Sequence, residues 1–147
     1  MISNYASNLI LKGMVGKGSS SDYATGSITL TVRAYLALSS TEPQKNGQGV
    51  TEPVGNGYAR KQIGWAKDAN GQMMGEPQDG VITNRDEIHF NEATADWPAA
   101  LNYVCIYDAA TSGNLIAWGA LKNPITAKAN TVPLIRIGEL TVSILDN

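Results

Sequence analysis

The stretch that decides the fold runs from residue 28 to residue 38 and reads Ile28-Thr29-Leu30-Thr31-Val32-Arg33-Ala34-Tyr35-Leu36-Ala37-Leu38. Every second residue from Ile28 to Leu38 is apolar, and threonine, arginine and tyrosine stand between them. Side chains alternate between the two faces of a β-strand, so this period of two predicts a strand with one buried face. Each of these apolar side chains contributes roughly 1–3 kcal/mol when buried, which favours a central position in a sheet.

Further stretches show the same strand-like composition, and turn signals separate them. The predicted strands cover residues 58–65, 87–90, 101–107, 114–121, 131–137 and 139–145. Turns are predicted at Asn70-Gly71 and Asp79-Gly80, and a hairpin at Ser112-Gly113-Asn114. Pro124 and Pro133 indicate strand edges or strand starts. About seven strands with glycine-rich connections predict an all-β fold, an antiparallel β-sandwich of Ig-like or jelly-roll-like type, with a closed barrel as the alternative.

A short helix is predicted before the strands. Its apolar positions follow helical spacing, and they are Ile2, Tyr5, Leu9 and Ile10. Ser3 is a candidate N-cap and Gly13 a candidate helix end. About three helical turns are marginal alone in water, so the apolar face must pack on its own domain or on a neighbour.

The segment after this helix is rich in glycine and serine, a composition typical of a flexible connector. We therefore expect two parts: residues 1–22, a helix with a flexible arm, and residues 23–147, a β-sandwich domain. A second breaker-rich stretch runs from Ser39 to Gly57, where Thr41-Glu42-Pro43 recurs as Thr51-Glu52-Pro53. We interpret these tripeptides as turn chemistry.

Composition and charge exclude several classes of partner. The 147 residues carry 11 basic and 13 acidic side chains, a formal charge of -2, and so provide no cationic surface for nucleic acid or an anionic membrane. The chain begins without the charged start and apolar run of a targeting sequence, and no apolar run is long enough for a membrane span. The single cysteine forms no intrachain disulfide and leaves the redox compartment open.

Catalytic and cofactor motifs are missing from the sequence. A nucleophilic relay would need His89, the single histidine, as its base, but the alternation around it predicts an ordinary exposed strand histidine. Cys105 lies in a buried-looking strand and is interpreted as a core residue. Gly16-Lys17-Gly18 and Gly55-Asn56-Gly57 lack the spacing of phosphate-binding loops. We predict neither an enzyme nor a cofactor or catalytic site.

Two weaker binding hypotheses remain. Residues 68–71 lack the other positions of an EF-hand, and Asn84-Arg85-Asp86-Glu87 is a looser calcium candidate that is more often a solvated turn. Trp65, Trp97 and Trp118 could stack on sugars, although tryptophans in a sandwich more often fill a core or an interface.

An ordered set of short blocks covers nearly the whole chain. After the start Ile2-Ser3-Asn4-Tyr5, the blocks are Tyr35-Leu36-Ala37-Leu38 with its Thr-acidic-Pro loop, Gly57-Tyr58-Ala59-Arg60, Ala93-Thr94-Ala95-Asp96-Trp97, Tyr107-Asp108-Ala109-Ala110-Thr111-Ser112-Gly113-Asn114-Leu115 and Gly119-Ala120-Leu121. In this set the chain resembles a family of small bacteriophage virion proteins, described as tail-fibre-like or head-decoration proteins. It departs from that pattern in the longer segment 66–80 and in the glycine–serine arm.

The resemblance implies a non-enzymatic structural subunit of the virion, made in the host cytoplasm and attached to capsid or tail proteins. It also implies a homo-oligomer, for instance a trimer, with no nucleic-acid or membrane partner. The alternative is a host-surface glycan-binding module of a tail fibre. The expected interface residues are Ile2, Tyr5, Leu9, Ile10 and Trp97.

Overall fold

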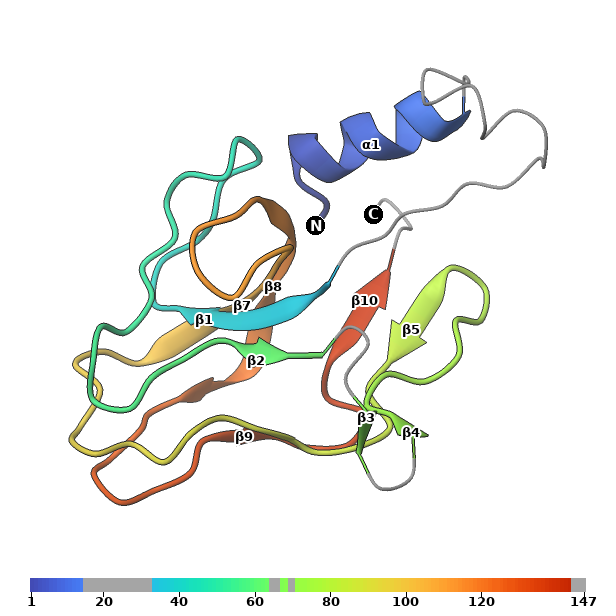
Figure 1. Cartoon of the computed structure of the whole chain (residues 1–147). Helices are drawn as coiled ribbons and strands as arrows, with labels where there is room; N and C mark the ends of the chain where they lie inside the picture. Colours follow the sequence, from blue (N-terminus) through green and yellow to red (C-terminus); the bar gives the residue numbers. More distant parts are fainter. Residues whose placement is uncertain (15–32, 64–66, 69–70, 144–147) are drawn as a thin grey trace.

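The chain is an antiparallel β-sandwich preceded by one short helix, as its alternation predicts (Figure 1). The computed structural model describes residues 1–14, 33–63, 67–68 and 71–143. The elements are α1 (Asn4–Met14), β1 (Tyr35–Ser39), β2 (Lys61–Gln62), β3 (Lys67–Asp68), β4 (Gly71–Gln72), β5 (Val81–Thr83), β6 (Ile88–His89), β7 (Leu101–Tyr107), β8 (Leu115–Ile125), β9 (Leu134–Ile135) and β10 (Thr141–Ser143).

A four-stranded sheet with the order β2-β1-β7-β8 forms one layer. Strand β1 is central, because β2 pairs with it on one side and β7 on the other, with Leu36 opposite Ile106 and Leu38 opposite Val104. This confirms the central position predicted for the decisive stretch over its described part. Residues 28–32 lie outside the described residues, and so do most of the connector and the proposed boundary at residue 22.

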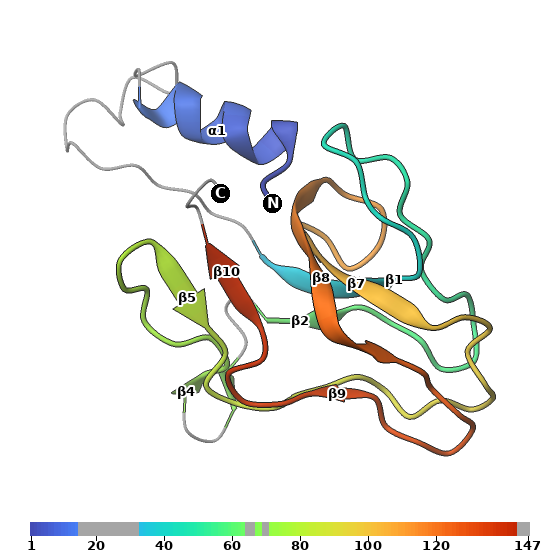
Figure 2. The same ribbon diagram turned by 180° about the vertical axis from the view of Figure 1, so that it is seen from behind.

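Two-stranded ladders form the other layer, β5 with β10 and β6 with β9 (Figure 2). The β6–β9 ladder is short, but its two segments stay bonded beyond it through Phe90 N to Pro133 O and Ala93 N to Thr131 O. Several predicted strands are therefore shorter than expected, because these segments are joined by isolated hydrogen bonds rather than by a regular ladder. Strand β5 was not predicted, since three residues are too few for a visible alternation.

The hairpin between β7 and β8 forms where it was predicted. Strand β7 has the predicted bounds, and β8 runs past its predicted end to Ile125. The connection runs from residue 108 to residue 114, and within it Ser112 and Gly113 have the left-handed φ values of 53° and 78°. Pro124 lies in β8, which is an edge strand of its sheet, and Pro133 immediately precedes β9, as predicted.

The four-stranded sheet is buried on both faces along β1 and the second half of β7, while β8 is partly exposed beyond Trp118. Leu36, Leu38 and Val104 point into the main core between the layers, where they pack with Ile88 and Ile135. A second cluster lies on the opposite face of the sheet and consists of Ala37, Cys105, Tyr107, Leu115 and Trp118. Val50 packs against it from residues 40–60 between β1 and β2, which we call the long loop. The loop after β1 therefore covers the outer face of the sheet.

Candidate functional site

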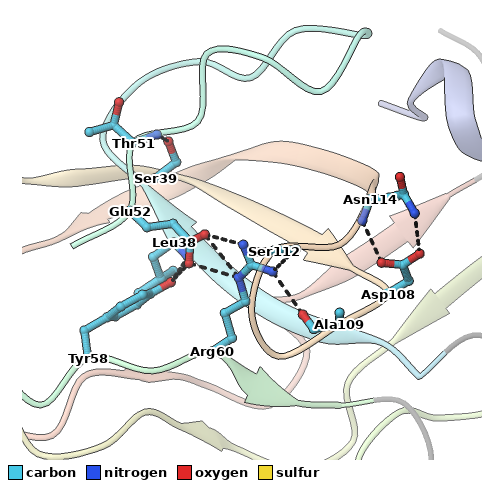
Figure 3. A network of polar contacts seen from close by, with 10 residues as sticks. All are labelled: Leu38, Ser39, Thr51, Glu52, Tyr58, Arg60, Asp108, Ala109, Ser112 and Asn114. Atoms are coloured by element: carbon cyan, nitrogen blue, oxygen red, sulfur yellow. Dashed lines mark hydrogen bonds and ion pairs between the residues drawn. The ribbon is translucent and has the colours of Figure 1, made fainter. Parts of the chain in front are cut away.

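A largely buried ion pair joins the long loop to the strands at one end of the sandwich (Figure 3). Arg60 Nη2 lies 2.6 Å from Glu52 Oε1, and the two side chains are 9% and 20% exposed. Arg60 Nη1 donates to the main-chain oxygens of Ala109 and Ser112 in the β7–β8 hairpin, at 3.0 and 2.7 Å. The guanidinium carbon also lies 3.7 Å from the centre of the Tyr107 ring. One side chain thus connects the loop, the strand end and the hairpin.

Tyr58 connects the same carboxylate to the central strand. Its hydroxyl donates to Glu52 Oε2 at 2.6 Å and accepts a hydrogen bond from Leu38 N at 3.1 Å. Burial, reinforced by the bond to Glu52, raises the pKa of Tyr58 far above its ordinary value. For Arg60, burial acts to lower the pKa, but the bonds to Glu52 outweigh it and the pKa is raised. Tyr58 therefore stays a neutral phenol and Arg60 stays a cation over the ordinary pH range.

This geometry explains two blocks of the sequence. Gly57 has a φ of 83°, and a Cβ at this position would collide with the carbonyl oxygen of Glu92, so glycine is required before Tyr58. The second Thr-Glu-Pro has a role beyond the turn chemistry that was expected of it, because Glu52 is the ion-pair partner of Arg60 and is 20% exposed. Glu42 in the first copy is exposed.

A second carboxylate ties the hairpin to the helix. Asp108 accepts hydrogen bonds from the backbone N and the side-chain Nδ2 of Asn114, at 2.6 and 2.9 Å, and from the side chain of Tyr5 at the start of α1. Partial burial acts to raise the pKa of Asp108, but these bonds outweigh it and hold the pKa below its usual value. Tyr5, an expected interface residue, is therefore used within the chain.

The first residues of the chain extend the four-stranded sheet at its β8 edge. Ser3 N donates to Ile116 O at 2.8 Å and Trp118 N donates to Met1 O at 2.9 Å, so Ile2 lies directly opposite Ala117. We call residues 1–3 the N-terminal strand segment. The Ser3 hydroxyl donates to Leu115 O and accepts from Ala6 N, which confirms Ser3 as the N-cap of α1. The segment is held mainly through main-chain groups.

Helix α1 leaves the body after its first turn and reaches away from the sheets in both views (Figures 1 and 2). Ala6 is buried, and Leu9 and Ile10 are half-buried. Leu11 is 56% exposed and Tyr5 is 37% exposed. The helix therefore carries apolar side chains that the described residues do not fully cover.

Trp97 is placed differently from the expectation. It is 3% exposed in the main core, where its ring lies edge-on to Tyr58 and its Nε1 donates to Asn56 O at 3.0 Å. A buried ring offers no surface to a partner or a sugar, so Trp97 is a core residue rather than an interface residue. Trp118 is also buried, and Trp65 lies outside the described residues, so the tryptophan platform for sugars is not formed by the two described rings.

The residues that were considered for chemistry lie apart. His89 is exposed beside Glu87, with Nε2 2.9 Å from Oε2, and its neighbours Ile88 and Phe90 are buried. Cys105 is fully buried, and burial raises the pKa of its thiol to about 12. Among the described residues, no three His, Cys, Asp or Glu side chains lie close enough to hold a metal ion. In the calcium-site candidate at residues 84–87, the Asn84 side chain is buried, and its Oδ1 accepts a hydrogen bond from Leu140 N at 2.9 Å. Asn84 therefore has a structural role.

Two cavities flank the N-terminal strand segment. One of about 330 Å³ lies between this segment, the long loop and the hairpin, and polar side chains such as Asn46 and Asn114 line it. The other, of about 550 Å³, runs between β8 and β10 and reaches the core side chains Val104 and Leu140. Ile2 lines the second cavity beside Ala117.

The chain matches one known protein family over nearly its whole length. Residues 1–143 match the family model described as Podophage GP4 fiber I protein gp80. The chain belongs to this family. The match spans α1 and every described strand, including the N-terminal strand segment and the Arg60 network. Among curated proteins, none matches the chain.

Membership in a phage fibre family makes this gp80-family chain a structural protein of the virion. It agrees with the resemblance that the ordered blocks indicated. No helix in the described part of the chain is long and apolar enough to cross a membrane. The pairing of Arg60 with Glu52 is not visible in the sequence, although the blocks that contain both residues are.

Proposed function

We propose that this chain is a non-enzymatic subunit of a phage tail fibre that contacts neighbouring virion proteins through the exposed side of α1. The contact side chains are Leu11 and the partly covered Leu9 and Ile10, while Ile2 and Tyr5 fix the start of the helix to the body. The observation that carries the proposal is the 56% exposure of Leu11 on a helix whose first turn is anchored.

The physical argument rests on what an isolated helix costs. Eleven residues of helix are marginal in water. Among the residues that the structure describes, Ala6 of α1 is buried whereas Leu11 is 56% exposed. A neighbouring subunit that covers Leu9 and Leu11 would gain roughly 25 cal/mol for each Å² of apolar surface removed from water. A rigid first turn also lowers the entropy that such a contact must overcome.

The test is incorporation of the subunit into particles. We expect Leu11→Glu to fold normally, because the side chain is exposed, and to be strongly depleted from purified phage, measured by quantitative mass spectrometry of particles. Val54→Glu is the matched control, since Val54 is 88% exposed and lies outside α1. Equal incorporation of the two variants would refute the role of α1.

The cavity of about 330 Å³ favours saccharide recognition as a second candidate function. Its lining combines the Asn46 and Asn114 amides with the Tyr5 ring, so it offers hydrogen-bonding groups and an aromatic surface to a small polar ligand. A host glycan that binds the purified wild-type chain but not Asn46→Ala would support this candidate. Equal binding by both proteins, or binding by neither, would reject it.

A further inference from the structure

We propose that the N-terminal strand segment and α1 are exchanged between copies of this chain, so that residues 1–11 of one subunit close the β8 edge of the next. This rests on the proposed function and names its partner: the neighbour that α1 contacts is a second copy. The acceptor surface is the β8 edge from Leu115 to Trp118 together with the main-chain oxygen of Lys45.

The bonds between donor and acceptor are local and mainly main-chain. Ser3 N to Ile116 O, Trp118 N to Met1 O and Asn4 N to Lys45 O, at 2.8, 2.9 and 2.9 Å, hold the segment to the body. An identical segment from another copy can make every one of these bonds in the same geometry. Exchange of an identical element is a low-cost route to an oligomer for this reason.

The chain between donor and body is long enough for exchange. It comprises residues 15–32, and a chain of that length reaches at most about 60 Å when extended. A domain of this size has a radius of gyration of about 15 Å, so the β8 edge of an adjacent copy is within reach.

Burial of α1 favours the exchanged arrangement over the closed one. Within a single chain, Ala6 is buried but Leu11 is 56% exposed. An exchange in the same geometry keeps the main-chain bonds of residues 1–4. It would also leave the side of α1 that carries Leu11 free to pack on the body from which the helix comes, and such packing would remove further apolar surface from water.

The pairing of Ile2 with Ala117 provides a direct test. Main-chain bonds flank this pair on both sides, which is the arrangement in which Cα atoms of antiparallel strands lie about 4.5 Å apart. That separation suits a disulfide. The native Cys105 does not compete, because it is fully buried and its thiol pKa is raised to about 12.

Two differently tagged full-length chains, one Ile2→Cys and one Ala117→Cys, are co-expressed and oxidised. We expect a disulfide between the two tagged chains on a non-reducing gel, and an interchain product from the single-chain double variant. A Tyr103→Cys chain with an Ala120→Cys chain is the control, since that pair lies within one body and must give no interchain product.

A double variant that closes only within its own chain would overturn the exchange, and so would the absence of any disulfide at residues 2 and 117. Neither result touches the proposed function, which depends on the loss of Leu11→Glu from particles. Conversely, an interchain disulfide with normal incorporation of Leu11→Glu would support the exchange and reject α1 as the attachment surface.

Discussion

Arg60 Nη2 and Glu52 Oε1 lie 2.6 Å apart at the end of the sandwich, and both side chains are largely withdrawn from water. Their pairing holds three parts of the chain that are far apart in sequence: the long loop, the strand end at β2 and the β7–β8 hairpin. Removing one partner of a buried pair leaves an uncompensated charge.

We expect Arg60→Ala to lower the free energy of unfolding by about 3 kcal/mol, measured by urea denaturation. Lys128→Ala is the matched control, because its ion pair with Asp96 is exposed, with side chains 67% and 55% accessible. It should cost about 0–1 kcal/mol. Similar losses for the two variants would show that the Arg60 pair is not special.

Tyr58→Phe removes one oxygen from the same network. The change leaves Leu38 N without its partner and Glu52 without one of its donors, so we expect a loss of about 1–3 kcal/mol. Tyr103→Phe, on a half-buried tyrosine of β7, should change stability far less. Thermal unfolding of both variants measures the two losses of stability. A Tyr58→Phe variant as stable as the wild type would contradict the role of the hydroxyl.

Gly55 and Gly57 both have a positive φ, but a Cβ would collide with another atom at only one of them. Substituting each by alanine therefore distinguishes the cost of backbone strain from the cost of a collision. Gly55 has a φ of 71° and open space at the Cβ position, whereas at Gly57, with a φ of 83°, a Cβ would meet Glu92 O. We expect Gly55→Ala to cost about 1 kcal/mol from backbone strain alone. Gly57→Ala should cost at least about twice that, because the loop must also move. Equal costs in denaturation would exclude the collision.

Asp108 gives the fold a dependence on acid pH. Its pKa in the folded chain lies below the ordinary value, so its contribution is present above the unfolded pKa of about 4. That contribution is lost as the pH falls through the lower folded value. The stability difference between wild type and Asp108→Asn should therefore shrink between pH 6 and pH 3 (roughly the window that brackets these values). A difference that is independent of pH would show that the carboxylate charge plays no part.

Ser3→Ala tests the anchoring of the N-terminal strand segment. The variant loses the cap of α1 and the bond to Leu115 O, at a cost of about 0.5–2 kcal/mol. We expect faster hydrogen exchange at Trp118 N–H, whose acceptor is Met1 O. Ser7→Ala, in the helix interior, is the control and should leave that amide protected.

The parts of this fold that could be predicted are the strands with a regular alternation or a continuous apolar run. Strand β7 was found with its bounds, because both of its faces are apolar and a turn follows directly. The burial of Trp97 could not be predicted, because a tryptophan has the same composition signal in a core and at an interface. The ion pair between Glu52 and Arg60 could not be predicted either, because a contact made by a loop residue produces no periodic pattern in a single sequence.

The four-stranded sheet is a wall between two apolar clusters, with Leu36 and Leu38 on one side and Ala37 and Cys105 on the other. A sheet that is covered on both sides in this way offers neither of its faces to a partner. What the subunit displays to its surroundings is α1, the exposed residues of the second layer such as His89, and the turns and strand edges around the sheets. Changes in these outer parts would alter what the subunit touches without disturbing the sheet between the two clusters.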